Sequence, residues 1–169
     1  MQPMNDAALR SLVNRVGRML VQRELRLATA ESCTGGWIAK CVTDVPGSSE
    51  WFDRGFVSYS NEAKQEMLGL DPELIRDQGA VSRSVVEAMA RGARSHSSAD
   101  VALAVSGVAG PGGGSPDKPV GTVWLALATD DGGVVSEQRR YGGNREAIRR
   151  AAVARALGMI DETYSGERG

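Results

Sequence analysis

The stretch Ala30-Glu31-Ser32-Cys33-Thr34-Gly35-Gly36 joins a short apolar run, Leu25 to Ala28, to a helix-like run, Trp37 to Val45. A strand, a turn of small residues and a helix in this order can direct backbone N–H groups at an anion or an oxyanion. The lysine of a GxxxxGK[ST] phosphate loop is absent. The alternative interpretation is an ordinary turn in which Thr34 caps the helix.

Length and composition bound the class of protein. The chain has 169 residues, of which 41% are hydrophobic and 24% charged, as in an ordinary soluble globule with one core. A net charge of −1 argues against broad attraction to nucleic acid. No apolar run approaches the roughly 20 residues that span a membrane, and residues 1–9 lack the apolar core of a signal peptide. We therefore expect no membrane partner and a cytoplasmic location.

Cysteine and histidine are scarce. Cys33 and Cys41 are too few for a disulfide scaffold. His96 is the single histidine, so a zinc site of the HExxH type is impossible and a Ser-His-Asp triad would have to use it. The polar surroundings of His96 indicate a surface connection after a helix. A base for hydrolysis is therefore expected from Lys, Tyr, Asp or Glu, with no metal and no cofactor.

Strand-like and helix-like segments alternate over the first two-thirds of the chain, and a hairpin follows. Val101 to Val105 is fully apolar, as in a covered parallel strand. Asp130 to Gly133 is a good turn between two strands, Val120 to Thr129 and Val134 to Tyr141. Helices are expected after Asp6, over Trp37–Val45, Glu62–Leu68 and Pro72–Gln78, from Ser82 or Ser84 to Arg94, and from Asn144 to Tyr164. The pattern predicts an α/β fold, a three-layer α/β/α sandwich with a mixed, partly parallel sheet, and a single domain over residues 1–169.

Three further residues could carry chemistry. Ser49 follows the helix-ending pair Pro46-Gly47, Tyr59 ends a strand-like run, and Lys64 falls in the first turn of the next helix. We expect these side chains to meet at one end of the sheet. A serine needs a neighbouring base to become a nucleophile, and a lysine with a lowered pKa is the expected base, with tyrosine as a proton relay. The alternative is that Ser49 caps, Tyr59 packs and Lys64 is solvated.

Cys33 is the competing nucleophile. With Glu31 and a nearby lysine it would complete a Cys-Glu-Lys arrangement of the amidase type. A small buried residue beside the turn is the commoner fate of a free cysteine.

Motifs at many separate places resemble one family. They are Thr29 to Gly36, Val45-Pro46-Gly47-Ser48-Ser49, Gly55 through Tyr59 to Lys64, Gly79-Ala80-Val81-Ser82, Ser106 to Pro111 and Lys118 to Val123. The chain resembles the CinA C-terminal family from about Leu12 to Leu157.

The resemblance implies an activity and a site. Family members hydrolyse the carboxamide of nicotinamide mononucleotide (NMN) to nicotinic acid mononucleotide and ammonia, so NMN is the implied partner. Ser49, Lys64 and Tyr59 occupy the positions of a catalytic serine, lysine and tyrosine. Ser32, Ser106 and Arg145 are implied to line the substrate site, together with the turn residues Thr34, Gly35 and Gly36.

Two other functions stay open from the sequence. One is a nucleotide-binding module that keeps the pocket without catalysis. The other is a phosphate-handling hydrolase that uses acidic residues near Gly110-Pro111, which would need a divalent ion. The sequence also leaves open whether the protein is a homo-oligomer.

Overall fold

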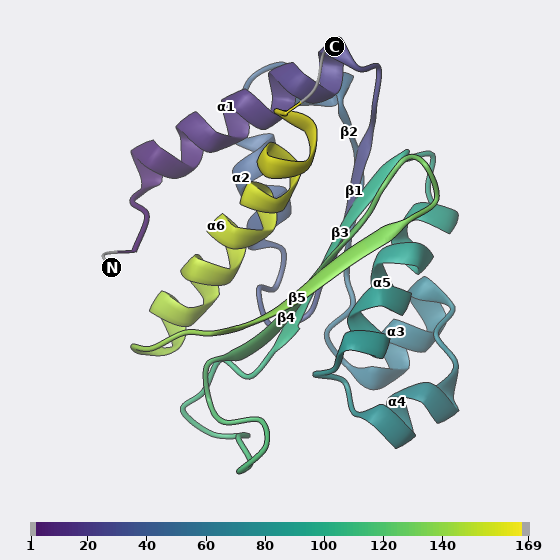
Figure 1. Cartoon of the computed structure of the whole chain (residues 1–169), viewed down its shortest axis with the longest axis vertical. Coiled ribbons are helices and arrows are strands. Elements are labelled where there is room, and N and C mark those ends of the chain that lie inside the picture. The colour runs from purple at the N-terminus through teal and green to yellow at the C-terminus, as the bar shows by residue number, and fades with distance from the viewer. Residues whose placement is uncertain (1–2, 167–169) are drawn as a thin grey trace.

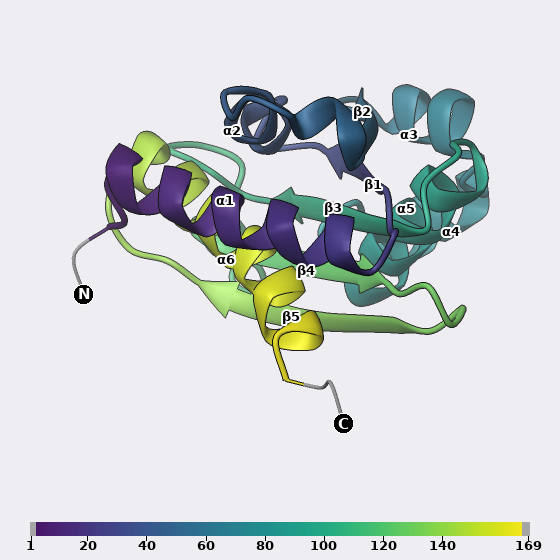
Figure 2. The same cartoon turned by 90° about the horizontal axis from the view of Figure 1, so that it is seen from above.

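The computed structural model describes residues 3–166 and contains one five-stranded sheet. Its strands are β1 (Leu27–Glu31), β2 (Phe52–Val57), β3 (Val101–Gly107), β4 (Thr122–Ala128) and β5 (Val134–Arg140). Their order across the sheet is β2-β1-β3-β4-β5, as Figure 2 shows from its top to its bottom edge. β1 pairs in parallel with β2 and β3, whereas β3–β4 and β4–β5 are antiparallel. The predicted mixed, partly parallel sheet is confirmed.

Helices cover both faces of the sheet (Figure 1). One face carries α1 (Asp6–Gln22), α2 (Trp37–Thr43) and α6 (Arg145–Tyr164). The other carries α3 (Asn61–Leu68), α4 (Pro72–Gln78) and α5 (Arg83–Ser95). The three-layer sandwich expected from the sequence is therefore confirmed.

The two faces of the sheet differ in side-chain size. Large residues such as Leu27, Leu103 and Leu125 face α1, α2 and α6. On the other face the central strands present alanines, which are Ala28, Ala30, Ala102, Ala104, Ala126 and Ala128. Small side chains let α5 lie close to the sheet, and its Val85, Val86 and Met89 fill the space between them.

The connections around β1 create the place where a site is expected. The β1–β2 connection runs through α2 on one face, and the β2–β3 connection runs through α3, α4 and α5 on the other. The connections that leave the carboxyl ends of the adjacent strands β1 and β2 therefore run to opposite faces of the sheet. In open α/β sheets ligands bind at such switch points, outside the carboxyl ends of the strands.

Several boundaries differ from the sequence prediction. The N-cap of α1 is Asn5, whose side chain accepts from Ala8 N, and Asp6 is the first helical residue. β2 begins at Phe52 and ends at Val57, so Tyr59 lies two residues beyond the strand. Ser82 and Asn144 cap their helices as predicted. Within residues 3–166 no helix is both long and apolar enough to cross a bilayer.

Candidate active site

Ser32 and Lys64 meet at the carboxyl edge of the sheet. Ser32 follows the last residue of β1, and Lys64 lies in the first turn of α3, which begins after β2. Because β1 and β2 are parallel, their carboxyl ends lie at the same edge. The Lys64 Nζ donates to Ser32 Oγ over 3.0 Å and to the Tyr59 carbonyl over 2.9 Å.

Lys64 is buried without a carboxylate partner. Its exposed fraction is 1%, and no Asp or Glu oxygen of residues 3–166 lies within ion-pair distance of its Nζ. Burial disfavours the ammonium form, so it lowers the pKa of Lys64 below the ordinary 10.5. A lysine in this state can take a proton from a hydroxyl, and the nearest hydroxyl is that of Ser32.

Tyr59 and Arg145 lie on the solvent side of Ser32 and Lys64, at the same carboxyl end of the sheet. The Tyr59 side chain is 60% exposed, and Arg145 Nη2 donates to its hydroxyl over 3.5 Å. Arg145 Nη1 donates to the Gly110 carbonyl over 2.8 Å. Arg145 is the first residue of α6, so three segments far apart in the sequence converge on this point. The guanidinium keeps further N–H groups that can bind a substrate anion.

Ser106 lies beside Ser32 in the sheet. Ser32 N donates to the Val105 carbonyl over 3.0 Å, which continues the β1–β3 ladder by one residue. The Ser106 hydroxyl is buried and donates to the Ala80 carbonyl over 2.8 Å. Because the Ser106 hydroxyl proton is engaged by the Ala80 carbonyl, its oxygen remains available only as an acceptor for a donor of a ligand.

The turn after Ser32 is built around Glu31. The Glu31 carboxylate accepts from Ile38 N over 2.8 Å and from Ala39 N over 3.1 Å, so it occupies the first free amides of α2. Gly35 N and Trp37 N also have internal partners. The chain therefore supplies its own carboxylate to the amides of Ile38 and Ala39, and an external anion or oxyanion is left only the amides of the preceding turn.

The amides of Cys33, Thr34 and Gly36 make no hydrogen bond within the described part of the chain. The Thr34 hydroxyl is buried and also lacks a partner there. Thr34 does not cap α2, since its N-cap is Gly36. Gly35 and Gly36 have φ angles of +59° and +97°, in the left-handed region that glycine adopts at least cost. These glycines shape the turn, and its free amides are the groups left for an oxyanion.

Ser49 does not join this group. It is exposed in a 3₁₀ turn (Ser48–Glu50) that precedes β2, whereas Lys64 follows the carboxyl end of β2. Six residues of strand separate the two ends by about 20 Å. The expected meeting of Ser49 with Tyr59 and Lys64 is therefore not found within one chain, because β2 carries Ser49 and Lys64 to opposite edges of the sheet.

Cys33 lies in the large-residue core of the α1, α2 and α6 face. It is buried in the same apolar cluster as Ile38, and burial raises the pKa of its thiol to about 11. A thiol in this state is a poor nucleophile, since the thiolate is the reactive form. The Cys-Glu-Lys arrangement is not formed, because Glu31 is bound to α2.

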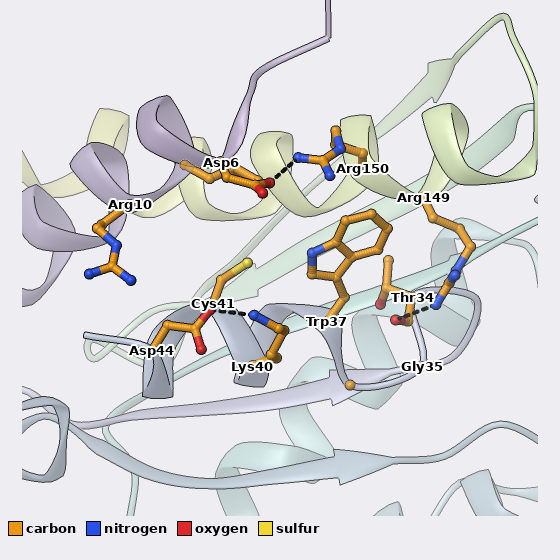
Figure 3. A pocket seen from close by; sticks show the side chains of 12 residues that line it. Asp6, Arg10, Thr34, Gly35, Trp37, Lys40, Cys41, Asp44, Arg149 and Arg150 are labelled. Atoms are coloured by element: carbon orange, nitrogen blue, oxygen red, sulfur yellow. Dashed lines mark hydrogen bonds and ion pairs between the residues drawn. The ribbon is translucent and has the colours of Figure 1, made fainter. Parts of the chain in front are cut away.

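The sequence missed one residue that supports the turn. Arg149 Nε donates to the Cys33 carbonyl over 3.0 Å, and its Nη2 donates to the Thr34 carbonyl over 3.2 Å. Figure 3 shows the second of these bonds. The available signal was the spacing of Arg145 and Arg149, because residues four apart lie on the same face of a helix.

Comparisons with known proteins agree with this architecture. Residues 9–164 match the model of the CinA C-terminal domain. The chain is 52% identical to the nicotinamide-nucleotide amidohydrolase PncC of Escherichia coli K12, over 95% of this chain and 98% of that protein. It is 55% identical to the protein of the same name from Pseudomonas putida, over 87% and 91% of the two chains. The crystal structure of the competence/damage inducible protein CihA from Agrobacterium tumefaciens superposes with a TM-score of 0.90 at 45% identity, over 96% and 98% of the two chains.

Proposed function

The chain belongs to the CinA C-terminal domain family, and on that premise we propose that it is an amidohydrolase that converts NMN to nicotinic acid mononucleotide and ammonia. Two relatives that cover nearly the whole chain are named nicotinamide-nucleotide amidohydrolases. The observation that carries the proposal is the 3.0 Å contact between Lys64 Nζ and Ser32 Oγ, in which the lysine is buried and lacks a carboxylate. The whole chain acts as one amidase domain.

In the proposed reaction Ser32 is the nucleophile and Lys64 the base. Neutral Lys64 takes the Ser32 proton while Ser32 Oγ attacks the carboxamide carbon. The tetrahedral intermediate collapses, the C–N bond breaks, and ammonia leaves with the proton that Lys64 returns. A water molecule, activated by the same lysine, then hydrolyses the ester and releases the nicotinate product.

The surrounding residues suit this reaction. The free amides of Cys33 and Thr34 are the donors available for the oxyanion. Arg145, held by the Gly110 carbonyl beside the Tyr59 hydroxyl, is the proposed anchor of the NMN phosphate. A charge-assisted contact of this kind is worth about 1.5–3 kcal/mol. Binding at the phosphate orients the carboxamide at Ser32.

The test is ammonia release from NMN, with nicotinic acid mononucleotide identified as the second product. Lys64→Met keeps the length of the buried side chain and removes the amine, so it is the matched control for the base. The proposal requires turnover in the unaltered protein and its loss in Lys64→Met with an unchanged circular dichroism spectrum. An unaltered protein that binds NMN and releases no ammonia is a nucleotide-binding module instead.

A further inference from the structure

A cavity is lined in part by the turn Thr34 to Gly36. It has a volume of about 540 Å³ and lies between α1, α2 and the start of α6, as Figure 3 shows. We call it the α1–α6 pocket. Its lining consists of Asp6, Leu9, Arg10, Thr34, Gly35, Gly36, Trp37, Lys40, Cys41, Asp44, Arg149 and Arg150. This volume falls in the range of small-molecule sites.

The charges around the α1–α6 pocket do not balance. Four cationic side chains line it against two carboxylates. Asp44 pairs with Lys40 at 2.5 Å, and Asp6 pairs with Arg150 at 2.6 Å. Both carboxylates of the pocket are therefore paired with one of its cations, Lys40 or Arg150.

Two guanidinium groups are left without a carboxylate. Within residues 3–166 neither Arg10 nor Arg149 forms an ion pair, and Arg149 donates instead to the neutral carbonyls of Cys33 and Thr34. Two uncompensated cations facing one cavity create a positive potential there. An anion that enters the pocket is attracted by both.

The aromatic residue of the pocket is already covered by cations. The guanidinium carbons of Arg149 and Arg150 lie 5.3 and 5.1 Å from the centre of the Trp37 ring. Each contact is in the range of a cation–π interaction. The indole is therefore already covered by cations, and a ligand is recognised there by its charge and not by stacking on the indole.

We propose that the α1–α6 pocket binds the phosphate group of a small molecule at a site separate from the amide chemistry. A phosphate offers several acceptor oxygens and up to two negative charges, and guanidinium groups bind it through paired hydrogen bonds.

The separation from Ser32 follows from the sheet. Ser32 points toward α3, where its Oγ receives the Lys64 hydrogen bond. The α1–α6 pocket lies under helices that cover the opposite face. A molecule bound in the pocket and a carboxamide at Ser32 are therefore on different sides of the turn Cys33 to Gly36. The two sites share that turn, because Thr34, Gly35 and Gly36 line the pocket and the Thr34 amide is a proposed donor to the oxyanion.

The test is calorimetric titration of the unaltered protein with inorganic pyrophosphate, in a metal-free buffer without phosphate. Arg10→Glu reverses one uncompensated charge, and we expect it to weaken pyrophosphate binding at least about tenfold. Arg18→Glu is the matched control, because Arg18 is exposed on the same helix and lines other cavities. Arg149 is not varied, since it also holds the turn.

Fluorescence locates the bound pyrophosphate. Quenching or enhancement of the emission is expected in the unaltered protein and is expected to disappear in Trp37→Phe, while calorimetric binding persists. Trp51 and Trp124 are left in place by this variant. A second titration with adenosine diphosphate identifies the source of the phosphate: tighter binding than pyrophosphate points to a nucleotide, and equal binding points to a free phosphate compound.

The kinetic arm rests on the proposed amidase function. Arg10→Glu is expected to leave KM for NMN within about twofold, because Arg10 lies on α1, on the opposite face of the sheet from α3 and Lys64. An equal rise in KM for NMN and in the Kd of pyrophosphate would overturn the separation, since the pocket would then hold the substrate phosphate. Absence of pyrophosphate binding at low salt would overturn the site itself. A protein that binds pyrophosphate but releases no ammonia would refute the amidase proposal alone.

Discussion

Two serine-containing turns, Ser32 to Gly36 and Pro46 to Ser49, begin and end the same short segment of chain, yet their surroundings differ. The first lies at the carboxyl edge of the sheet, where Ser32 accepts a hydrogen bond from a buried lysine. The second lies before β2 at the opposite edge, where Ser49 is exposed. Both turns match motifs of one family.

A base can act on the serine of the first turn but not on that of the second. A serine becomes a nucleophile only when a base reaches its proton, at about 2.6–3.2 Å. In a parallel pair of strands, groups after both carboxyl ends meet, and a group before one amino end cannot join them. The geometry therefore favours Ser32 over Ser49, and the predictions below test that preference.

The largest effect is expected from the two serines themselves. Ser32→Ala removes the proposed nucleophile and should lower kcat for NMN by at least about 10⁴-fold, as loss of a covalent nucleophile does. Ser49→Ala should stay within about twofold, since its hydroxyl makes no hydrogen bond within residues 3–166 and lies at the opposite end of β2 from Lys64. Ammonia release measures both. An inactive Ser49→Ala beside an active Ser32→Ala would mean that Ser49 of a second copy of the chain completes the site. The active species would then have to be an oligomer.

The second-largest loss of activity is expected at Lys64, the proposed base. Lys64→Arg keeps the positive charge but cannot lose it near neutral pH. We expect kcat to fall at least about 100-fold, the usual worth of general base catalysis. Single-turnover measurement of the acylation step separates this loss from slow product release. Turnover near that of the unaltered protein would remove Lys64 from proton transfer.

The outer part of the site should contribute less. Arg145→Ala removes the proposed phosphate anchor and should lower kcat/KM for NMN by about 10- to 100-fold, which corresponds to one or two charge-assisted contacts. The same variant should hardly change kcat/KM for nicotinamide riboside, which lacks the phosphate. The ratio of the two values is therefore the measurement. If Arg145→Ala left the ratio of kcat/KM for NMN to kcat/KM for nicotinamide riboside unchanged, the arginine would not bind the phosphate. Its role would then be limited to the hydrogen bond with the Gly110 carbonyl.

The pH dependence follows from the burial of Lys64. The neutral amine is the active form, so kcat/KM should rise by about tenfold per pH unit below the pKa of Lys64 and then level off. Because burial lowers this pKa, the plateau should begin below pH 10.5, the ordinary value of a lysine. A rate profile between pH 6 and 10 checks the sign. Activity that falls as the pH rises through this range would require a protonated Lys64.

The smallest effect is expected at Cys33. Cys33→Ala removes a buried thiol that faces the apolar core, so kcat should stay within about threefold and stability should fall by about 1 kcal/mol. Urea denaturation and ammonia release measure the two quantities. If Cys33→Ala released no ammonia while its stability was unchanged, Cys33 would replace Ser32 as the proposed nucleophile.

Much of the architecture was predictable because it is local. The apolar run around Ala28, the turn of small residues and the hairpin at Asp130 to Gly133 each carry their own signal. Ser82 and Asn144 cap helices through hydrogen bonds to residues three positions away, so the sequence is sufficient to predict them.

The candidate site was predictable in part. Tyr59 and Lys64 could be proposed from their places after a strand-like run, whereas Ser32 and Arg145 were implied only by the family resemblance. The structure brings these four residues to one end of the sheet. The sequence leaves Glu31 as a possible catalytic carboxylate beside Cys33. Its role in binding α2 depends on where the helix begins, which a motif does not specify.

The sequence by itself determined the alternation of strands and helices, the turn after β1 and the chemical character of the residues near it, because each depends on neighbours within a few positions. The tertiary structure alone decided which serine meets the lysine. That choice depends on parallel pairing between β1 and β2, which joins residues 32 positions apart. It also decided that Arg149, over 110 residues from the turn, holds two of its carbonyls. Contacts over such distances in sequence follow from packing and strand order, and no local pattern encodes them.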